Sequence, residues 1–506
     1  MVIEYYTQNL PFPLPLILLL VGCLGMPLFG LLSEKNRSPR IRDFWLIFIT
    51  TVSLASIYVS YGQISAATNN ILVFKIWDQT PPLGGCFEVD MLGVFMVFSI
   101  SLLGFFVAIY STTYMKGEKR LTEFYTLLIL TMAGMTGVVL AGDMLTLFIF
   151  WEIMSITSYV LVSFFKGNWG GIEAGFKYLI MSSMAGAFIL LSMSLIYGMT
   201  GTLNFASIAS TLRGADLSPW MILLFGTLVI GFGVKSAIVP MHTWLPDAYS
   251  EAPDPVSSLL AGIATETALF ALTRVLYIIF EPGVFMIPIA ILALITMTFG
   301  NIMALRQDNV KRLLAYSSIA QIGYIMIGVS SGIVYGLLGA FLHIFNHALM
   351  KGMAFLAVGN IVKQTGKHDV SQMQGLGKVM PYTSLAITVA MLGLGGVPGT
   401  SGFISKFVLF SAALGAGQPI LAIVGVLNAA LSMAYYLKVI MTLYSGNIPI
   451  DLKVKEAPFV MIGITSVIAI IIVVFGFYPN PILEFASNAS KALIDGRNNY
   501  IGAVLH

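Results

Sequence analysis

Residues 231–253, GFGVKSAIVPMHTWLPDAYSEAP, combine an apolar stretch with Gly231, Gly233, Lys235 and Pro240. Proline removes a backbone donor and breaks a helix. A lysine near the middle of a bilayer costs about 2.5–3.5 kcal/mol on insertion scales, so it is a functional candidate. Broken helices occur at membrane depth only where the backbone is buried in protein or lines a polar cavity. The stretch therefore predicts an interrupted transmembrane helix with a functional charge near the break.

The composition of the whole chain is that of a polytopic membrane protein. Of the 506 residues, 58% are hydrophobic and 10% are charged, and the mean hydropathy is +0.90. A soluble domain carries about 25% charged residues. The sequence predicts an all-α integral membrane protein of about 14 transmembrane helices. The expected spans lie near residues 12–32, 44–62, 91–113, 122–140, 143–165, 176–199, 219–242, 255–279, 283–305, 313–331, 334–361, 383–413, 417–444 and 457–478.

Several other classes are excluded by charge and cysteine content. The net charge of +3 gives no indication of nucleic-acid binding. Cys23 and Cys86 are too few for an iron–sulfur cluster held by cysteines of this chain, which needs four thiolates. The first apolar stretch follows no basic segment and is too long for a signal peptide, so we expect a retained span.

Loop charges predict the orientation. Lysine and arginine gather in the loops after odd-numbered spans, whereas the loops after even-numbered spans hold only Lys75 and Arg213. Cytoplasmic loops carry the excess of these residues in membrane proteins. We therefore expect the odd-numbered loops to be cytoplasmic and both termini to lie outside.

A second interruption lies in the twelfth span, at Gly395, Gly396, Pro398 and Gly399. The two breaks are five spans apart, and an odd offset inverts the second copy. The pattern is typical of two inverted five-helix repeats with broken helices in spans 7 and 12, and it points to a transport site. The expected domains are residues 1–121 with spans 1–3, 122–282 with the first repeat, 283–446 with the second repeat, and 447–506 with span 14 and a tail.

Ionisable residues near span centres form the candidate site. Burial disfavours the charged form of a lysine and a nearby carboxylate favours it, so neutralising the carboxylate helps the lysine to release a proton. Imidazole suits such a relay because it titrates near physiological pH. The expected proton or ion relay comprises Glu152, Lys235, Glu266, His343, His347, Lys351 and Lys406. Accessory candidates are His242, Asp247, Lys438 and Asp143.

Each candidate also has a structural interpretation. Glu152 and Lys235 could form an ion pair between helices, although such pairs are costly in lipid. His343 and His347, spaced i, i+4, could be structural or could bind zinc, although no glutamate follows the first as in HExxH. Lys351 and Lys438 could extend their amines to the membrane–water interface. The mid-span position of Lys351 argues against this interpretation, whereas for Lys438 it explains the residue as well as a functional role does.

Four motifs carry a resemblance to a known family. They are VKSAIVPMHTWLPDAYSEAP (234–253), FWEIMSITSYVLV (150–162), the face of His343, His347 and Lys351, and the pattern GxxGFxSKF that ends at Phe407. In their order along the chain they resemble the antiporter-like subunits of respiratory complex I, membrane-bound hydrogenases and Mrp-type sodium/proton antiporters, over roughly residues 120–410.

The resemblance implies fourteen helices with two inverted repeats. It implies that Glu152 pairs with Lys235 in an entry half, that the central histidines and Lys351 form a connection, and that Lys406 ends an exit half. It also implies a large complex in the plasma membrane of a prokaryote, with iron–sulfur, flavin or nickel–iron cofactors in partner subunits and none in this chain. The implied partners are other membrane subunits, lipid and protons, with sodium as the alternative ion.

One position departs from the family pattern. Many members carry a lysine in the eighth span at the place that Glu266 occupies here. We hypothesise that Glu266 pairs with Lys235 and alters the direction, efficiency or ion preference of this half-channel. The C-terminal tail is also short, which predicts that the long lateral helix of the longest members is absent.

Four functions compete on the sequence. The first is an ion-translocating subunit of a redox-driven pump of the hydrogenase or complex I type, itself without a catalytic centre. The second is a subunit of an Mrp-type antiporter, which shares every motif. A redox enzyme that binds quinone itself lacks any recognisable ligand set here, and GLGGVPGTSG does not follow a strand as a phosphate loop would. A structural scaffold with a closed ion path conflicts with the number of mid-span charges.

Overall fold

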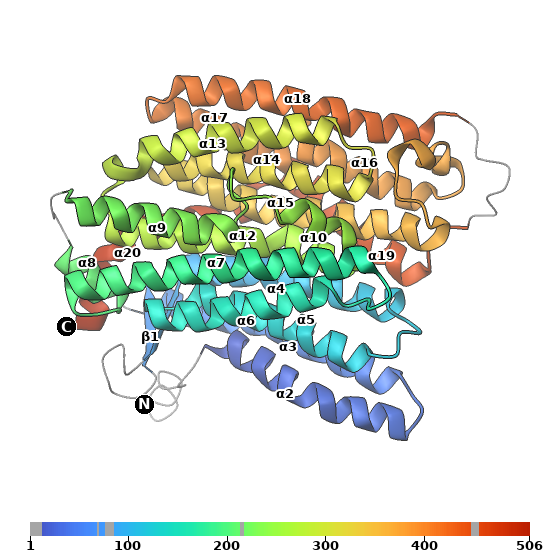
Figure 1. The fold of residues 1–506 in the computed structure, drawn as a ribbon, viewed down its shortest axis with the longest axis horizontal. Helices are drawn as coiled ribbons and strands as arrows, with labels where there is room; N and C mark the ends of the chain where they lie inside the picture. Colours follow the sequence, from blue (N-terminus) through green and yellow to red (C-terminus); the bar gives the residue numbers. More distant parts are fainter. Residues whose placement is uncertain (1–12, 68–69, 76–84, 213–216, 447–454, 506) are drawn as a thin grey trace.

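The computed structural model describes residues 13–67, 70–75, 85–212, 217–446 and 455–505. These residues form 19 α-helices and one antiparallel hairpin (Figure 1). The helices up to the middle of the chain are α2 (Leu14–Lys35), α3 (Arg40–Ala66), α4 (Met91–Tyr114), α5 (Leu121–Leu140), α6 (Met144–Val162), α7 (Trp169–Thr200), α8 (Phe205–Thr211), α9 (Pro219–Lys235), α10 (Leu245–Glu251), α11 (Asp254–Leu259) and α12 (Thr265–Ile279). The remaining helices are α13 (Pro282–Leu305), α14 (Val310–Ser330), α15 (Val334–Thr365), α16 (Pro381–Gly395), α17 (Ser401–Gly415), α18 (Pro419–Tyr444), α19 (Phe459–Phe477) and α20 (Asn480–Leu505).

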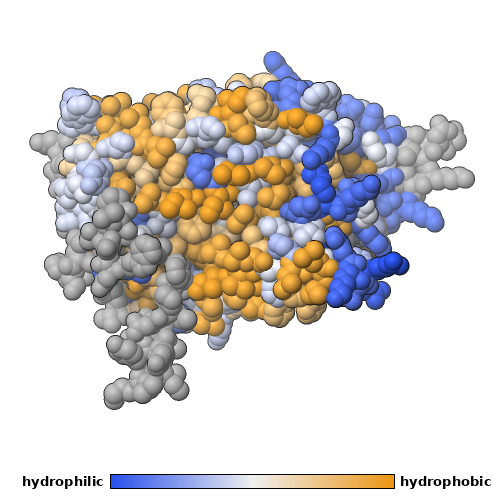
Figure 2. All heavy atoms as spheres, turned by 60° about the horizontal axis from the view of Figure 1, so that its bottom comes forward, coloured by the Kyte–Doolittle hydropathy of each residue, from blue (hydrophilic) through white to orange (hydrophobic). Residues whose placement is uncertain are grey.

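The long helices run side by side as in a membrane protein (Figure 1). Within the described residues, 12 helical segments are long and apolar enough to cross a bilayer. They coincide with the predicted spans other than the seventh and the twelfth, which are the interrupted ones. Figure 2 shows an apolar band that ends at a strongly hydrophilic end on the right. Residues 1–12, Arg213 and residue 506, on which the expected orientation partly rests, lie outside the described residues.

Both predicted interruptions are present. Helix α9 continues through Gly231 and Gly233 and ends at Lys235, so these glycines lie within the helix and the break follows them. A Cβ on Gly231 would lie 3.2 Å from the carbonyl oxygen of Ala185, so this glycine allows α9 to approach α7. The break itself includes Pro240, and α10 begins at Leu245.

The twelfth span is divided into α16 and α17 as predicted. Gly396 and Gly399 lie between them with φ of +83° and +88°, a region in which a side chain would be strained. Side chains bind the carbonyl groups that the breaks leave free. Trp244 Nε1 donates to Val234 O over 2.7 Å, and Lys406 Nζ donates to Leu394 O over 2.6 Å.

The eighth span contains a feature that the sequence did not predict. Between α11 and α12 the chain forms one π-helical turn, η1 (Leu260–Ala264). Such turns occur frequently at functional sites because they redirect the residues that follow. The segment from Asp254 to Ile279 is entirely buried, as are α14 and α15 in their apolar windows. These central helices therefore offer a protein-lined environment for ionisable groups.

Two further elements lie outside the expected spans. The hairpin of β1 (Ile71–Lys75) and β2 (Cys86–Asp90) precedes α4, and Val73 pairs with Glu88. The predicted C-terminal tail forms helix α20, which packs against α15 and α4. Short 3-10 turns, η2 (Val370–Met373) and η3 (Leu376–Lys378), connect α15 to α16.

Close packing of α13 against α14 leads to a stability prediction. A Cβ on Gly323 would lie 2.5 Å from the backbone nitrogen of Met297. Gly323→Ala should therefore lower the thermal unfolding midpoint in detergent, because overpacking costs about 1–3 kcal/mol. Gly226→Ala is the matched control, since a Cβ on Gly226 meets no described atom within 4 Å. Equal midpoints for the two variants would contradict the prediction.

Candidate functional site

Lys235 lies at the end of α9 and is 1% exposed. Its Nζ donates to Ser155 Oγ over 3.2 Å and lies 4.6 Å from the ring centroid of Tyr178. Glu152 lies on α6 three residues before Ser155 and is half-buried. Among the described residues no direct ion pair joins Glu152 to Lys235, so a hydroxyl and an aromatic ring hold the amine.

A column of aromatic rings connects this lysine to the eighth span. Tyr178 stacks on Trp244 with ring centroids 3.9 Å apart, and Trp244 makes an edge contact with Tyr249. The Tyr249 hydroxyl donates to Leu260 O over 2.9 Å and lies 3.4 Å from Thr265 Oγ1. The rings therefore link the break after α9 to the π-helical turn.

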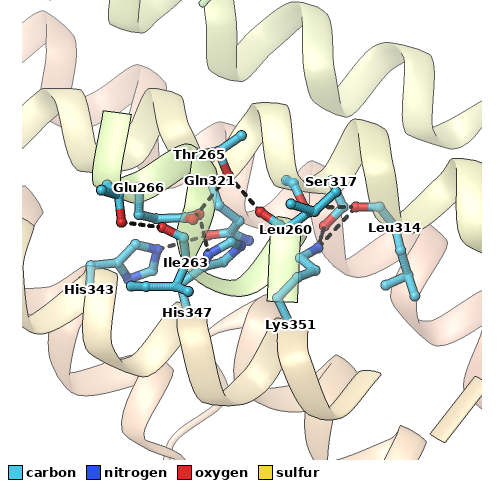
Figure 3. A network of polar contacts seen from close by, with 12 residues as sticks. Leu260, Ile263, Thr265, Glu266, Leu314, Ser317, Gln321, His343, His347 and Lys351 are labelled. Atoms are coloured by element: carbon cyan, nitrogen blue, oxygen red, sulfur yellow. Dashed lines mark hydrogen bonds and ion pairs between the residues drawn. The ribbon is translucent and has the colours of Figure 1, made fainter. Parts of the chain in front are cut away.

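Glu266 lies on α12 and is fully buried. Thr265 Oγ1 donates to Glu266 Oε2 over 3.0 Å, and His347 Nδ1 lies 2.7 Å from Glu266 Oε1 (Figure 3). The predicted pair of Glu266 with Lys235 is wrong, because Glu266 contacts α15 whereas Lys235 contacts α6. Neither nitrogen of His347 has a hydrogen-bond partner among the described residues, and neither does Glu266 Oε1, so the 2.7 Å contact has the distance of an ion pair but not the geometry of a hydrogen bond.

His343 lies one turn away on the same face of α15, with the two imidazole centroids 6.3 Å apart. Its Nε2 is 2.9 Å from Gln321 Oε1 and its Nδ1 is 2.9 Å from Ser405 Oγ. The Gln321 amide orientation follows from Nε2, which donates to Leu394 O over 3.1 Å. Since Gln321 Oε1 can only accept, His343 Nε2 carries hydrogen.

The orientation of the Ser405 hydroxyl depends on the charge of His343. With neutral His343, Nδ1 accepts the hydroxyl proton of Ser405. With protonated His343, Nδ1 donates to Ser405, whose hydroxyl turns to Gly402 O at 3.1 Å. Rotation of one hydroxyl is therefore enough to accommodate a proton on His343.

The two remaining central lysines bind polar groups of neighbouring helices. Lys351 Nζ donates to Ser317 Oγ over 2.7 Å and to Leu314 O over 3.1 Å (Figure 3). Ser317 in turn hydrogen-bonds Tyr436. Lys406 Nζ, besides its bond to Leu394 O, lies 4.6 Å from the Tyr324 ring centroid. Both amines are thus hydrogen-bonded without a direct ion pair among the described residues.

The accessory candidates lie apart from the buried residues described above. Asp143 caps α6 by accepting from Thr146 N over 2.7 Å, and Asp247 pairs with Lys177 at 3.0 Å and with Arg312. Lys438 is 49% exposed and lies 3.6 Å from Asp308. His242 is buried against the ring of Phe299 within the break that follows α9.

Several polar partners were not predicted from the sequence. Gln321, Ser405 and Ser155 are uncharged, and their mid-span position was the only signal. Two ionic clusters at the ends of the eighth span were not predicted either. Lys311 Nζ lies 2.8 Å from Asp254 Oδ1, and Arg274 Nη2 lies 2.9 Å from Asp90 Oδ2. Arg274 and Asp254 are charges inside or beside an apolar stretch, which could have identified them.

The zinc alternative finds no support in the described part of the chain. No group of three or more histidine, cysteine or acidic residues is arranged to hold a metal ion there. Both nitrogens of His343 are engaged by Gln321 and Ser405.

The role of Gln321 gives a second stability prediction. Gln321→Leu leaves the buried His343 Nε2 without its acceptor, and an unsatisfied buried polar group costs about 1–3 kcal/mol. We expect a lower thermal unfolding midpoint in detergent, whereas the exposed control Gln372→Leu should leave it unchanged. A Gln321→Leu protein as stable as this control would show that the hydrogen bond does not support the core.

The sequence matches two known protein families. Residues 141–432 match the family described as NADH:quinone oxidoreductase/Mrp antiporter, TM. Residues 83–125 match the family described as NADH-Ubiquinone oxidoreductase (complex I), chain 5 N-terminus.

Individual relatives extend the similarity over most of the chain. NADH-quinone oxidoreductase subunit N of Desulforudis audaxviator is 37% identical over 73% of this chain and 74% of its own length. F(420)H(2) dehydrogenase subunit N of Methanosarcina mazei is 33% identical over 92% of this chain and 96% of its own length. A chain of the Mrp complex from a Dietzia species shares the fold with a TM-score of 0.89 at 24% identity, covering 98% of this chain and 100% of that one. The chain therefore belongs to the NADH:quinone oxidoreductase/Mrp antiporter family of membrane subunits.

Proposed function

We propose that the chain is the proton-translocating, antiporter-like subunit of a redox-driven ion-pumping complex. The observation that carries the proposal is the 2.7 Å contact between Glu266 and His347 in a fully buried line of ionisable groups. Isolated charges in this environment are costly, so a buried acid and imidazole in contact are candidates for proton exchange. The matching relatives named as dehydrogenase and oxidoreductase subunits support the redox-driven form.

The central contact suggests how a proton moves. A proton shared by Glu266 and His347 leaves the pair neutral on whichever partner it resides. Because His347 Nε2 has no described partner, a proton accepted at Nδ1 can be released at Nε2, and His343, whose ring centroid is 6.3 Å away, is the next imidazole on this face of α15. His343 can hold it through the Ser405 rotation. Lys235 and Lys406 are then the first and the last residue of this series of buried ionisable groups, and each lies next to a helix break.

The proposal includes the topology and partners expected from the sequence. We place fourteen crossings by counting α9 as the seventh span and α16 with α17 as the twelfth, in two inverted repeats of residues 122–282 and 283–446. Both termini lie outside a prokaryotic plasma membrane. Other membrane subunits pack beside the chain, and iron–sulfur, flavin or nickel–iron cofactors reside in partner subunits.

Lys235→Ala should abolish proton translocation while the complex still assembles. The buried amine would lose its place beside Ser155 and Tyr178, and no other described cation binds there. The measurement is redox-driven proton uptake into liposomes that contain the purified complex, with subunit content checked by gel. Lys166→Ala, an exposed lysine between α6 and α7, is the matched control. Proton uptake that survives in Lys235→Ala would remove Lys235 from the path.

Glu266→Gln should lower the translocation rate severely and change its pH profile. The amide keeps the shape of the side chain but cannot exchange a proton with His347. The same liposome assay, repeated over a series of pH values, gives the rate and the profile. An unchanged rate with an unchanged profile would show that Glu266 does not carry protons.

Glu152→Gln should lower the translocation rate less than Glu266→Gln does, because Glu152 is half-buried and acts on Lys235 only at a distance.

The Mrp-type sodium/proton antiporter is the alternative, since the family and the fold include it. The liposome experiment separates the two functions. Proton uptake that depends on electron transfer favours the redox-driven pump. Proton flux that needs sodium and no electron donor favours the antiporter.

A further inference from the structure

A buried ionic cluster lies at the end of α12, outside the relay described above. Arg274 Nη2 is 3.0 Å from Glu88 Oε1 and 2.9 Å from Asp90 Oδ2, and Nη1 donates to Val139 O over 2.9 Å. The three charged side chains are each at most 5% exposed. The cluster therefore joins the hairpin strand β2 to the end of the eighth span.

The charges of this cluster do not balance if both acids are ionised. Among the described residues, Arg274 is the one cation that forms an ion pair with either carboxylate. A buried uncompensated charge is strongly unfavourable, and one of two neighbouring carboxylates tends to retain a proton. One acid of the pair is therefore expected to be neutral.

The hydrogen bonds indicate which acid is neutral. Asp90 Oδ1 accepts from Gly93 N over 2.6 Å as the cap of α4, and Oδ2 binds Arg274, so both oxygens have donors. Glu88 Oε2 is buried and has no hydrogen-bond partner among the described residues. Leaving one oxygen of an ionised carboxylate without a donor costs more than leaving a neutral acid partly unsatisfied.

The surroundings favour the same assignment. Burial raises the pKa of the Glu88 carboxyl above its ordinary range, while Arg274 lowers it and Asp90 raises it. On the neighbouring elements, Lys75 of β1 lies opposite Cys86 in the register of the hairpin, and its side chain is exposed. Asp143, before α6, is engaged by Thr146 and by the backbone nitrogen of Cys86. These contacts bring no second cation to Glu88.

The position of the cluster relates it to the central acid. Arg274 follows Glu266 by two helical turns, or about 12 Å along α12. The hairpin lies at the end of the molecule opposite the α2–α3 and α13–α14 connections (Figure 1). Residues 267–273 carry no charge and are buried, so Arg274 with its two carboxylates is the next charged group along α12 from Glu266 toward this end.

We propose that Glu88, Arg274 and Asp90 form a proton-binding site in which Glu88 carries the proton, and that this site is the station through which protons pass between Glu266 and the hairpin end of the membrane. The second part rests on the proposed proton translocation. The first part is independent of transport. When Glu88 releases its proton, the cluster gains a negative charge that Arg274 alone does not balance. This charge favours the binding of the next proton, so proton release and proton uptake at Glu88 are coupled.

Infrared difference spectroscopy of the whole purified complex between two pH values tests the binding site. Protonated carboxylic acids give a carbonyl band that shifts in heavy water. We expect such a band to be lost in Glu88→Gln, to shift in frequency in Glu88→Asp and to keep its frequency in Asp90→Glu. The exposed acid variant Glu123→Gln is the control and should retain it. The site is overturned if Glu88→Gln has the bands of the unsubstituted complex, or if Asp90→Glu shifts the band and Glu88→Asp does not.

Redox-driven proton uptake in liposomes tests the station. Glu88→Gln should lose proton translocation while electron transfer continues, and full translocation would overturn this role. If Glu88→Gln does not assemble, Glu88→Asp provides the test through its band shift, and an unshifted band would overturn the assignment. If the unsubstituted complex moves no protons, the proposed function and the station fail together, whereas the infrared bands still decide the binding site.

Discussion

An ionisable group inside a bilayer requires polar partners from the protein, and the contact between Glu266 and His347 is where this constraint is most severe. Neither group reaches solvent, and the two lie 2.7 Å apart. The surrounding architecture provides the shielding. The eighth span, α14 and α15 are buried over their apolar windows, while other helices cover them. The central helices can therefore carry polar residues because lipid does not contact them.

The same constraint connects the helix breaks to the lysines. An interrupted helix leaves carbonyl groups without intrahelical donors. At the end of α16, Leu394 O receives both Lys406 Nζ and Gln321 Nε2, and Gln321 also binds His343. Gln321 therefore connects His343 to the same carbonyl that binds Lys406. A change in the charge of Lys406 thus acts on a carbonyl group that is also bound by the hydrogen-bond partner of His343. In the proposed function, the atoms that cap the broken helix also bind the groups that exchange protons, which accounts for the breaks and the buried charges lying together.

The sequence was informative wherever one residue type has a strong physical consequence. Apolar length predicted the long spans, and Pro240 and the glycines at 396 and 399 predicted two interruptions. The face of His343, His347 and Lys351 followed from helical spacing and is present on α15. The partners could not be predicted, because they depend on packing between distant segments. The π-helical turn before Glu266 arises in an ordinary-looking stretch, LAGIA, and it accompanies a glutamate directed to His347 rather than Lys235. The cluster of Arg274 with Glu88 likewise joins residues that are far apart in the chain.

The most direct measurement is to extract the chain from its native membrane in mild detergent, identify every co-purifying subunit by mass spectrometry and determine iron and nickel content. If the chain belongs to a redox-driven pump, it will co-purify in a large complex with additional membrane subunits and with redox subunits that contain iron–sulfur clusters, flavin or nickel–iron. Co-purification with small membrane subunits alone, without metal or flavin, would contradict a redox-driven pump and would favour the sodium/proton antiporter.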